Sequence, residues 1–331
     1  MKKILISIVL VTFLASTASA EFSKVGSSGA QFLKIAVGSK YQAMGEAAVA
    51  VANDVYATYW NPAGLAEIEN AEVSFTNVNY LLDINLNYVG FARHFEDVGV
   101  FGVSATVLST GEQEITTLEE QDGTGEFYSA TSYAVGVSYA RQLNVQFAFG
   151  ASLKYIGERI HNETSEGFAV DFGTLLYPGV ESLRLGVAIS NMGPEMTFSG
   201  SDLMVSYYED DDATNPVSAE LRTNPYELPL MFRIGAAYDM QFAPNSVITL
   251  AGELKHPNDN EQQGAVGAQL AFNEMFFIRS GYMLNYEEQG LTVGGGLDTR
   301  ISQNTHLVID YAWQDFGRLE STQRFSVGFT F

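Results

Sequence analysis

Runs of alternating apolar and small residues recur along the chain from about residue 71 to its end. In one such run Tyr133, Val135, Val137 and Tyr139 alternate with Ala134, Gly136, Ser138 and Ala140. Because successive side chains of a β-strand point to opposite faces, each run predicts a strand with one apolar face and one face of small residues. The small-residue face carries only occasional charges, whereas a solvated face would carry many Lys, Glu and Thr. It therefore predicts an enclosed, packed interior.

The alternating runs define fourteen candidate strands. They cover residues 72–80, 86–95, 98–108, 127–141, 145–159, 166–177, 182–191, 229–241, 246–256, 264–272, 275–285, 289–301, 305–314 and 322–331. Many have roughly ten residues, the length with which a tilted strand crosses a bilayer, and single-chain bacterial barrels have an even strand number. The predicted fold is an all-β, transmembrane, fourteen-stranded antiparallel outer-membrane β-barrel. A soluble β-sandwich is the alternative, because its strands alternate as well.

The connections between these strands sort by parity. Every second one is short: residues 96–97, 142–144, 178–181, 243–245, 273–274 and 302–304. The other set includes two long segments, near residues 109–126 and 192–228. Outer-membrane barrels have short periplasmic turns and longer extracellular loops, and a sandwich has no reason to sort its loops in this way. We therefore expect both termini in the periplasm and the long loops outside the cell.

The first twenty residues have the features of a secretory signal peptide. Lys2 and Lys3 precede a short apolar run, and Ala18-Ser19-Ala20 fits a small-x-small cleavage site. The alternative is an inner-membrane anchor, which needs about 20 apolar residues, more than this run contains. The chain has no cysteine, so neither a lipoprotein attachment site nor a disulfide framework is expected.

The last strand ends in a second export-related pattern. Phe325, Val327, Phe329 and the terminal Phe331 alternate with Ser326, Gly328 and Thr330. This looks like the C-terminal signal that the barrel-assembly machinery reads. Outer-membrane lipid and that machinery are thus the expected partners of the barrel itself.

Residues 21–70 do not follow the strand pattern. The stretch is rich in Ala, is interrupted at Gly38 and Gly45, and contains the turn-forming sequence Asn61-Pro62-Ala63-Gly64. A barrel of this size has an interior wide enough to need filling. We therefore expect an N-terminal plug, or hatch, over residues 21–70 and the transmembrane barrel over 71–331. A periplasmic extension is the alternative.

Residue chemistry gives little support for an enzyme. The four histidines are scattered without metal-ligand spacing, no Gly-x-Ser-x-Gly motif occurs, and no catalytic, metal or cofactor-binding residue is expected. Gly294-Gly295-Gly296 lies inside a strand, which favours close packing against the plug or a bend over a phosphate loop. The formal charge of −22 with no basic cluster argues against nucleic acid.

Several charges fall on the small-residue faces and are expected to point into the lumen. They are Lys154, Asp171, Arg184, Arg233, Asp239, Arg279, Asp298 and Asp310. They could line a polar conduit. We favour a paired network that fastens the plug to the wall, because an unpaired enclosed charge is costly.

Both long loops are acidic, which is typical of a solvated, repulsive surface, although carboxylates could also bind Ca²⁺ or a basic partner. The second loop also has an apolar patch, which is where we expect a protein partner. Its residues are Leu203, Met204, Val205, Tyr207 and Tyr208.

Four stretches within residues 32–65 form a recognisable pattern. They are Phe32-Leu33-Lys34-Ile35-Ala36-Val37-Gly38, Gln42-Ala43-Met44-Gly45, Ala50-Val51-Ala52-Asn53-Asp54 and Tyr59-Trp60-Asn61-Pro62-Ala63-Gly64-Leu65. Together they resemble the opening of the PorV/PorQ family. One departure is Glu46, where a second small residue is expected. The family belongs to the FadL-like barrels, whose members also carry an Asn-Pro-Ala turn in an N-terminal hatch.

The resemblance implies a non-enzymatic role in type IX secretion or in the surface attachment of exported proteins. The implied partners are secreted proteins or secretion-complex subunits. The alternative is a FadL-like channel that passes hydrophobic small molecules across the outer membrane.

Overall fold

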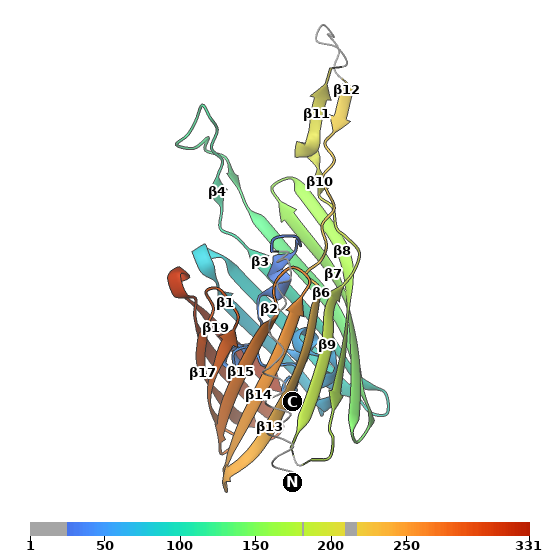
Figure 1. Cartoon of the computed structure of the whole chain (residues 1–331), viewed down its shortest axis with the longest axis vertical. Coiled ribbons are helices and arrows are strands. Elements are labelled where there is room, and N and C mark those ends of the chain that lie inside the picture. The colour runs from blue at the N-terminus through green and yellow to red at the C-terminus, as the bar shows by residue number, and fades with distance from the viewer. Residues whose placement is uncertain (1–24, 181, 209–216) are drawn as a thin grey trace.

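Fourteen antiparallel strands form a closed barrel in the computed structural model, which describes residues 25–180, 182–208 and 217–331 (Figure 1). The barrel strands are β1 (Ala71–Asn79), β2 (Asn85–Phe95), β3 (Gly99–Ser109), β6 (Ala130–Asn144), β7 (Phe147–Ile160), β8 (Glu163–Leu176), β9 (Arg184–Met192), β13 (Met231–Ala243), β14 (Ser246–Pro257), β15 (Gln263–Phe272), β16 (Phe276–Leu284), β17 (Leu291–Ser302), β18 (Thr305–Asp315) and β19 (Ser321–Thr330). The barrel closes where β1 pairs with β19, with Val73 opposite Phe329. The predicted fold class is confirmed.

The two faces of the wall differ as the alternation predicts. On β6, Val135 and Val137 are exposed on the outer face, while Ala134 and Ala140 are buried on the inner face. Each barrel strand pairs with a neighbour on both sides, so the sheet closes on itself, as a bilayer requires. None of the described helices is long and apolar enough to span a membrane.

The connections extend unequally from the two ends of the barrel. At one end short turns join the strands. At the other, the hairpin of β4 (Gln113–Glu114) and β5 (Phe127–Tyr128) and the ribbon of β11 (Met204–Tyr207) and β12 (Val217–Glu220) project beyond the wall (Figure 1). We call this the long-loop end. The fourth barrel strand was predicted to start at residue 127, but Phe127 and Tyr128 pair with β4 instead. Two short 3-10 turns, η3 (Leu81–Asp83) and η5 (Gly317–Leu319), also connect strands at this end.

The barrel wall is shorter at β9, because β9 pairs with β8 along only part of that strand. Asn191, in a left-handed conformation (φ 64), turns the chain away, and its N–H donates to Asp171 Oδ1 at 2.8 Å. Beyond it the chain turns inward, so that Met196 is buried against the hatch. It rejoins the β8 edge through β10 (Ser199–Gly200) and continues into the turn η4 (Ser201–Leu203).

The described residues ahead of β1, 25–70, lie inside the barrel, and we call them the hatch. They form four short helical turns: η1 (Gln31–Lys34), α2 (Ser39–Ala43), α3 (Ala57–Trp60) and η2 (Pro62–Glu67). Helix α2 stays short because Gly38 before it and Gly45 after it adopt positive φ values of 81° and 67°, which a helix cannot contain. The predicted signal peptide, residues 1–20, lies outside the described residues.

Candidate functional site in the hatch-filled lumen

The hatch has its own aromatic core. Trp60, Tyr41 and Met44 are fully buried, and the Trp60 indole Nε1 donates to the Val37 carbonyl at 2.9 Å. Tyr41 and Trp60 pack with ring centroids 6.0 Å apart. This core gives the short helices a fixed shape, since isolated helices of this length are unstable in water.

The Asn61-Pro62-Ala63-Gly64 turn joins the hatch to the wall. Asn61 Oδ1 accepts from the Ala63 N–H at 3.2 Å, which caps η2. Its Nδ2 donates to Val49 O within the hatch at 2.7 Å and to Thr174 O on β8 at 3.1 Å. The turn residues thus lie buried at the hatch–wall boundary.

Five wall glycines face the hatch backbone at close range. They are Gly150, Gly173, Gly186, Gly267 and Gly281, on β7, β8, β9, β15 and β16. A Cβ at any of them would lie less than 3.0 Å from an atom of the hatch. Glycine is required wherever two backbones approach so closely. The hatch is therefore fitted to the wall rather than loosely enclosed by it.

The lumen-facing charges form pairs, mostly between strands of the wall. Lys154 Nζ lies 2.8 Å from Asp171, Arg184 Nη2 lies 2.8 Å from Asp239, and Arg279 Nη1 lies 2.5 Å from Asp310. Asp298 accepts from His306 at 2.8 Å, and Arg233 Nε lies 3.9 Å from Glu253. Gly296 leaves the space in which Arg279 reaches Asp310 across β17. The expected pairs are present, but each of them joins two strands of the wall and does not join the hatch to the wall.

Other residues, which the sequence reasoning missed, fasten the hatch to the wall. Lys255 on β14 forms a buried ion pair with Glu46, and Glu253 Oε2 accepts from the N–H groups of Ala48 and Val49 at 2.8 and 2.7 Å. Arg324 on β19 donates to the Ala36 carbonyl at 3.2 Å. The charged side chains of β14 were detectable by alternation. Their partners were not, because hydrogen bonding between the hatch and β14 depends on tertiary structure.

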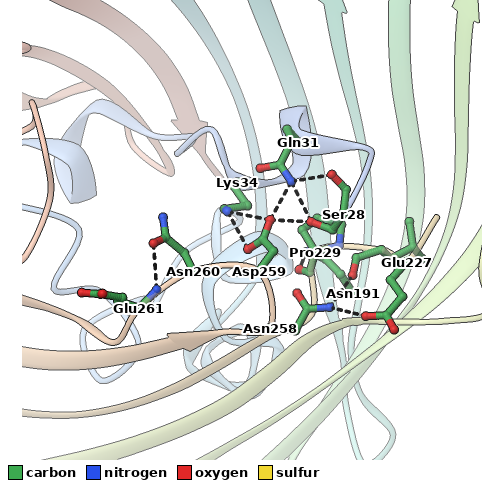
Figure 2. A network of polar contacts seen from close by, with 11 residues as sticks. Ser28, Gln31, Lys34, Asn191, Glu227, Pro229, Asn258, Asp259, Asn260 and Glu261 are labelled. Carbon is green, nitrogen blue, oxygen red and sulfur yellow. Dashed lines mark hydrogen bonds and ion pairs between the residues drawn. The ribbon is translucent and has the colours of Figure 1, made fainter. Parts of the chain in front are cut away.

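A second anchor holds the start of the hatch at the long-loop end. Asp259, in the connection between β14 and β15, accepts from Ser28 Oγ, from Gln31 Nε2 at 2.7 Å and from Lys34 Nζ at 2.9 Å (Figure 2). We call these four residues the N-terminal clasp. Burial of Asp259 opposes its ionisation, but the hydrogen bonds from Ser28, Lys34 and Gln31 outweigh burial and hold the pKa below its usual range.

The long segment between β9 and β13 meets the hatch beside this clasp. Ser28 pairs with Glu227 in a parallel bridge, and Met196 pairs with Tyr226. Asn258 Nδ2 donates to Glu227 Oε2 at 3.1 Å, and Asn191 Nδ2 donates to the Pro229 carbonyl at 3.0 Å (Figure 2). The first hatch residues, the β14–β15 connection and the long segment are thus one polar network.

The described part of the barrel contains a small cavity and an open cleft. One, of about 10 Å³, lies between the hatch and the wall and is lined by Lys34, Tyr59, Lys154 and Arg233. Arg233 Nε and Nη1 and the Tyr59 hydroxyl are buried there, and none of these atoms has a well-aligned hydrogen-bond partner among the described residues. The other is an open cleft of about 640 Å³ at the short-turn end, lined in part by His94, His306 and Phe331. The cationic lining of the small cavity could hold a water molecule or a small polar group.

The remaining predicted residues lie on the surface of the barrel and its ribbon. Phe325, Phe329 and Phe331 are exposed on the outer side at the chain's end, and Val327 lies on the same face and is partly buried. In the apolar patch, Met204, Tyr207 and Tyr208 are about half exposed, while Leu203 and Val205 are partly buried. The patch runs along η4 and β11, beyond the barrel wall (Figure 1).

Solved structures of other proteins share this architecture. The Pseudomonas putida toluene transporter TodX is similar with a TM-score of 0.61 and 12% identity, covering 89% of this chain and 98% of its own. The Ralstonia pickettii toluene transporter TbuX has a TM-score of 0.56 at 13% identity, over 88% and 97%. A Pseudomonas aeruginosa FadL homologue has a TM-score of 0.53 at 11% identity, over 89% and 98%. The fold is that of a FadL-like outer-membrane β-barrel.

Residues 18–204 match the family model described as type IX secretion system protein PorV. The chain belongs to the PorV family, which confirms the resemblance drawn from residues 32–65. No curated protein sequence matches the chain.

Proposed function

We propose that this protein is a non-enzymatic outer-membrane component of type IX protein secretion that supports the export or surface attachment of other proteins. The family match over residues 18–204 carries this proposal. The close fit of the hatch also supports the proposal. The hatch contacts glycines of five wall strands, and such a filled lumen favours a barrel that binds other proteins on its surface rather than one that acts as an open channel.

The β11–β12 ribbon is the surface we assign to a secreted protein or a secretion-complex subunit. Met204, Tyr207 and Val217 are more than half exposed on it. Exposed apolar residues gathered on a projecting element are typical of protein-binding sites. Within the described part of the chain neither strand pairs with a third strand, so their outer edges can pair with a strand of a partner.

Sorting of the loops supports an orientation with the long-loop end outside the cell and the C-terminus in the periplasm. The cysteine-free chain allows a direct test. A Leu118→Cys variant, at an exposed position of the first long loop, should react with a membrane-impermeant maleimide on intact cells. An Asp97→Cys variant, in the turn after β2, should react only after the outer membrane is permeabilised. The reverse pattern would invert the orientation.

Deletion of the gene tests the secretion role. Exported proteins should then accumulate in the periplasm. In a strain that carries a tagged copy of the gene, the barrel should copurify with these proteins. A Met204→Ser/Tyr207→Ser variant should reproduce the export defect, whereas Phe127→Ser, at an exposed position of the other projecting hairpin, should export normally. Normal export in the deletion strain would refute the proposal.

The second candidate function is a FadL-like channel for hydrophobic small molecules. The fold it shares with the toluene transporters TodX and TbuX supports this alternative. In this case deletion should abolish uptake of a radiolabelled hydrocarbon or fatty acid while export stays normal. The same deletion strain therefore separates the two functions.

A further inference from the structure

Two arginines lie on the outer face of the wall at the short-turn end. Arg93 on β2 and Arg141 on β6 flank β3, and both are exposed. Their neighbours Ala92 and Ala140 are fully buried on the inner face, so alternation points the arginines outward. Phe91 and Val137, on the same outer face, are 40% and 55% exposed and belong to the apolar surface that faces lipid.

An aromatic platform lies between the two arginines. Register places Arg93 opposite Phe101 and Phe101 opposite Tyr139, two residues before Arg141. The Phe101 ring lies 5.8 Å from that of Phe95 and 5.1 Å from that of Tyr139. The Arg93 guanidinium lies 5.5 Å from the Phe95 ring centre. Such aromatics mark the level at which a barrel passes from hydrocarbon to headgroups.

Neither guanidinium forms an ion pair with a carboxylate of the described residues. The luminal arginines differ, since Arg184, Arg233 and Arg279 each have a carboxylate within 4.0 Å. Across the sheet the two Cα atoms are about 10 Å apart, and along the strands about 7 Å, from standard strand spacings. Two extended arginine side chains can converge on one group from these positions.

Acidic residues stand next to this pair, further from the apolar surface. Glu96 and Asp97 form the exposed turn that follows Phe95, and Asp97 has a left-handed conformation (φ 61). From the apolar belt outward the surface thus presents two cations among aromatic rings and then two anions. A phospholipid with an ethanolamine headgroup presents the complementary order of acyl chain, phosphate and ammonium.

We propose that this rim, formed by Arg93, Arg141, Glu96 and Asp97, is a binding site for phosphatidylethanolamine in the periplasmic leaflet. The guanidinium groups bind the phosphate, for which arginine is suited by its planar, multiple donors. The turn carboxylates accept from the ammonium group. The leaflet follows from the proposed orientation, but the headgroup chemistry does not depend on it.

Native mass spectrometry of the detergent-solubilised full chain tests the site. Phosphatidylethanolamine should bind the wild type more tightly than phosphatidylglycerol, which has no amine. In an Arg93→Gln/Arg141→Gln variant its affinity should fall about tenfold or more, since hydrogen bonds to charged groups are worth at least that factor. Glu96→Gln/Asp97→Asn should remove the preference for phosphatidylethanolamine and leave phosphatidylglycerol bound.

Arg159→Gln is the matched control, because Arg159 is also exposed on the outer face but at the long-loop end of β7. It should leave phosphatidylethanolamine binding within about twofold of wild type. The gel mobility of unboiled samples verifies that each variant is folded. Unchanged binding in the double arginine variant, or equal weakening by Arg159→Gln, would overturn the site. A preserved preference in the Glu96/Asp97 variant would overturn the ammonium contact. Neither outcome bears on export, which the deletion strain measures separately.

Discussion

At Gly173 the barrel wall has no room for a methyl group. A Cβ there would meet Asn61 Oδ1 and lie 2.9 Å from Pro62 Cδ, both in the hatch turn. We expect Gly173→Ala to displace this turn and cost roughly 1–3 kcal/mol, as overpacking does. The measurement is the temperature at which the folded gel band converts to the unfolded one. Gly252→Ala is the control, because its nearest neighbour would be 4.0 Å away; equal transition temperatures for the two variants would contradict the fit.

Contacts of single residues also explain Glu46, which departs from the family pattern. Glu46 replaces an expected small residue, yet it is buried and paired with Lys255, whose Nζ also lies 3.2 Å from the Tyr286 hydroxyl. Its φ of 67° is unusual for a side chain of this size. Removing one partner of a buried ion pair is far more costly than removing both. Glu46 can therefore replace a small residue at this buried position only because Lys255 is present as its partner.

At the scale of elements, the N-terminal clasp makes the start of the hatch sensitive to acid. The pKa of Asp259 is lowered in the folded protein, so its contribution to stability is present above the unfolded pKa of about 3.9 and is lost as pH falls through the folded value. We expect backbone amides of residues 28–35 to lose protection from hydrogen exchange below about pH 4, after correction for the intrinsic rate.

An Asp259→Asn variant supplies the control for the clasp. It should show the weakened protection already at neutral pH, with little further change on acidification. Protection that falls with pH equally in the wild type and in the variant would place the acid-sensitive group elsewhere.

At the scale of the whole molecule, the hatch determines whether the barrel conducts. A fourteen-stranded wall encloses a wide interior, and here the hatch and its ion pairs occupy it. We expect the purified protein to show no persistent ion conductance in a planar lipid bilayer. A variant without residues 25–70 that retains the folded gel mobility should conduct. Stable conductance steps from the intact chain would contradict a sealed lumen.

The sequence by itself determined the barrel, its strand number and the family. The outer face of each strand meets lipid and carries apolar residues, whereas the inner face meets the lumen and carries small or polar ones. Each strand therefore alternates with a period of two, which can be recognised from its own sequence. Asn61-Pro62-Ala63-Gly64 and the residues around it likewise identify the family from a continuous stretch. The inward direction of Arg279 and Asp310 also followed from alternation, because it depends on the strand alone.

Only the tertiary structure decided what the charges and the hatch do. Lys255 and Glu46 are separated by 209 residues, and Lys34 and Asp259 by 225, and no local pattern connects residues so far apart. The expectation that luminal pairs fasten the plug was wrong for Lys154–Asp171 and Arg184–Asp239, which join neighbouring strands. The reason for glycine at these wall positions is seen only in the structure, where the hatch lies directly opposite them. Periodicity fixes the face on which a side chain lies, but closure of the barrel around the hatch fixes its partner.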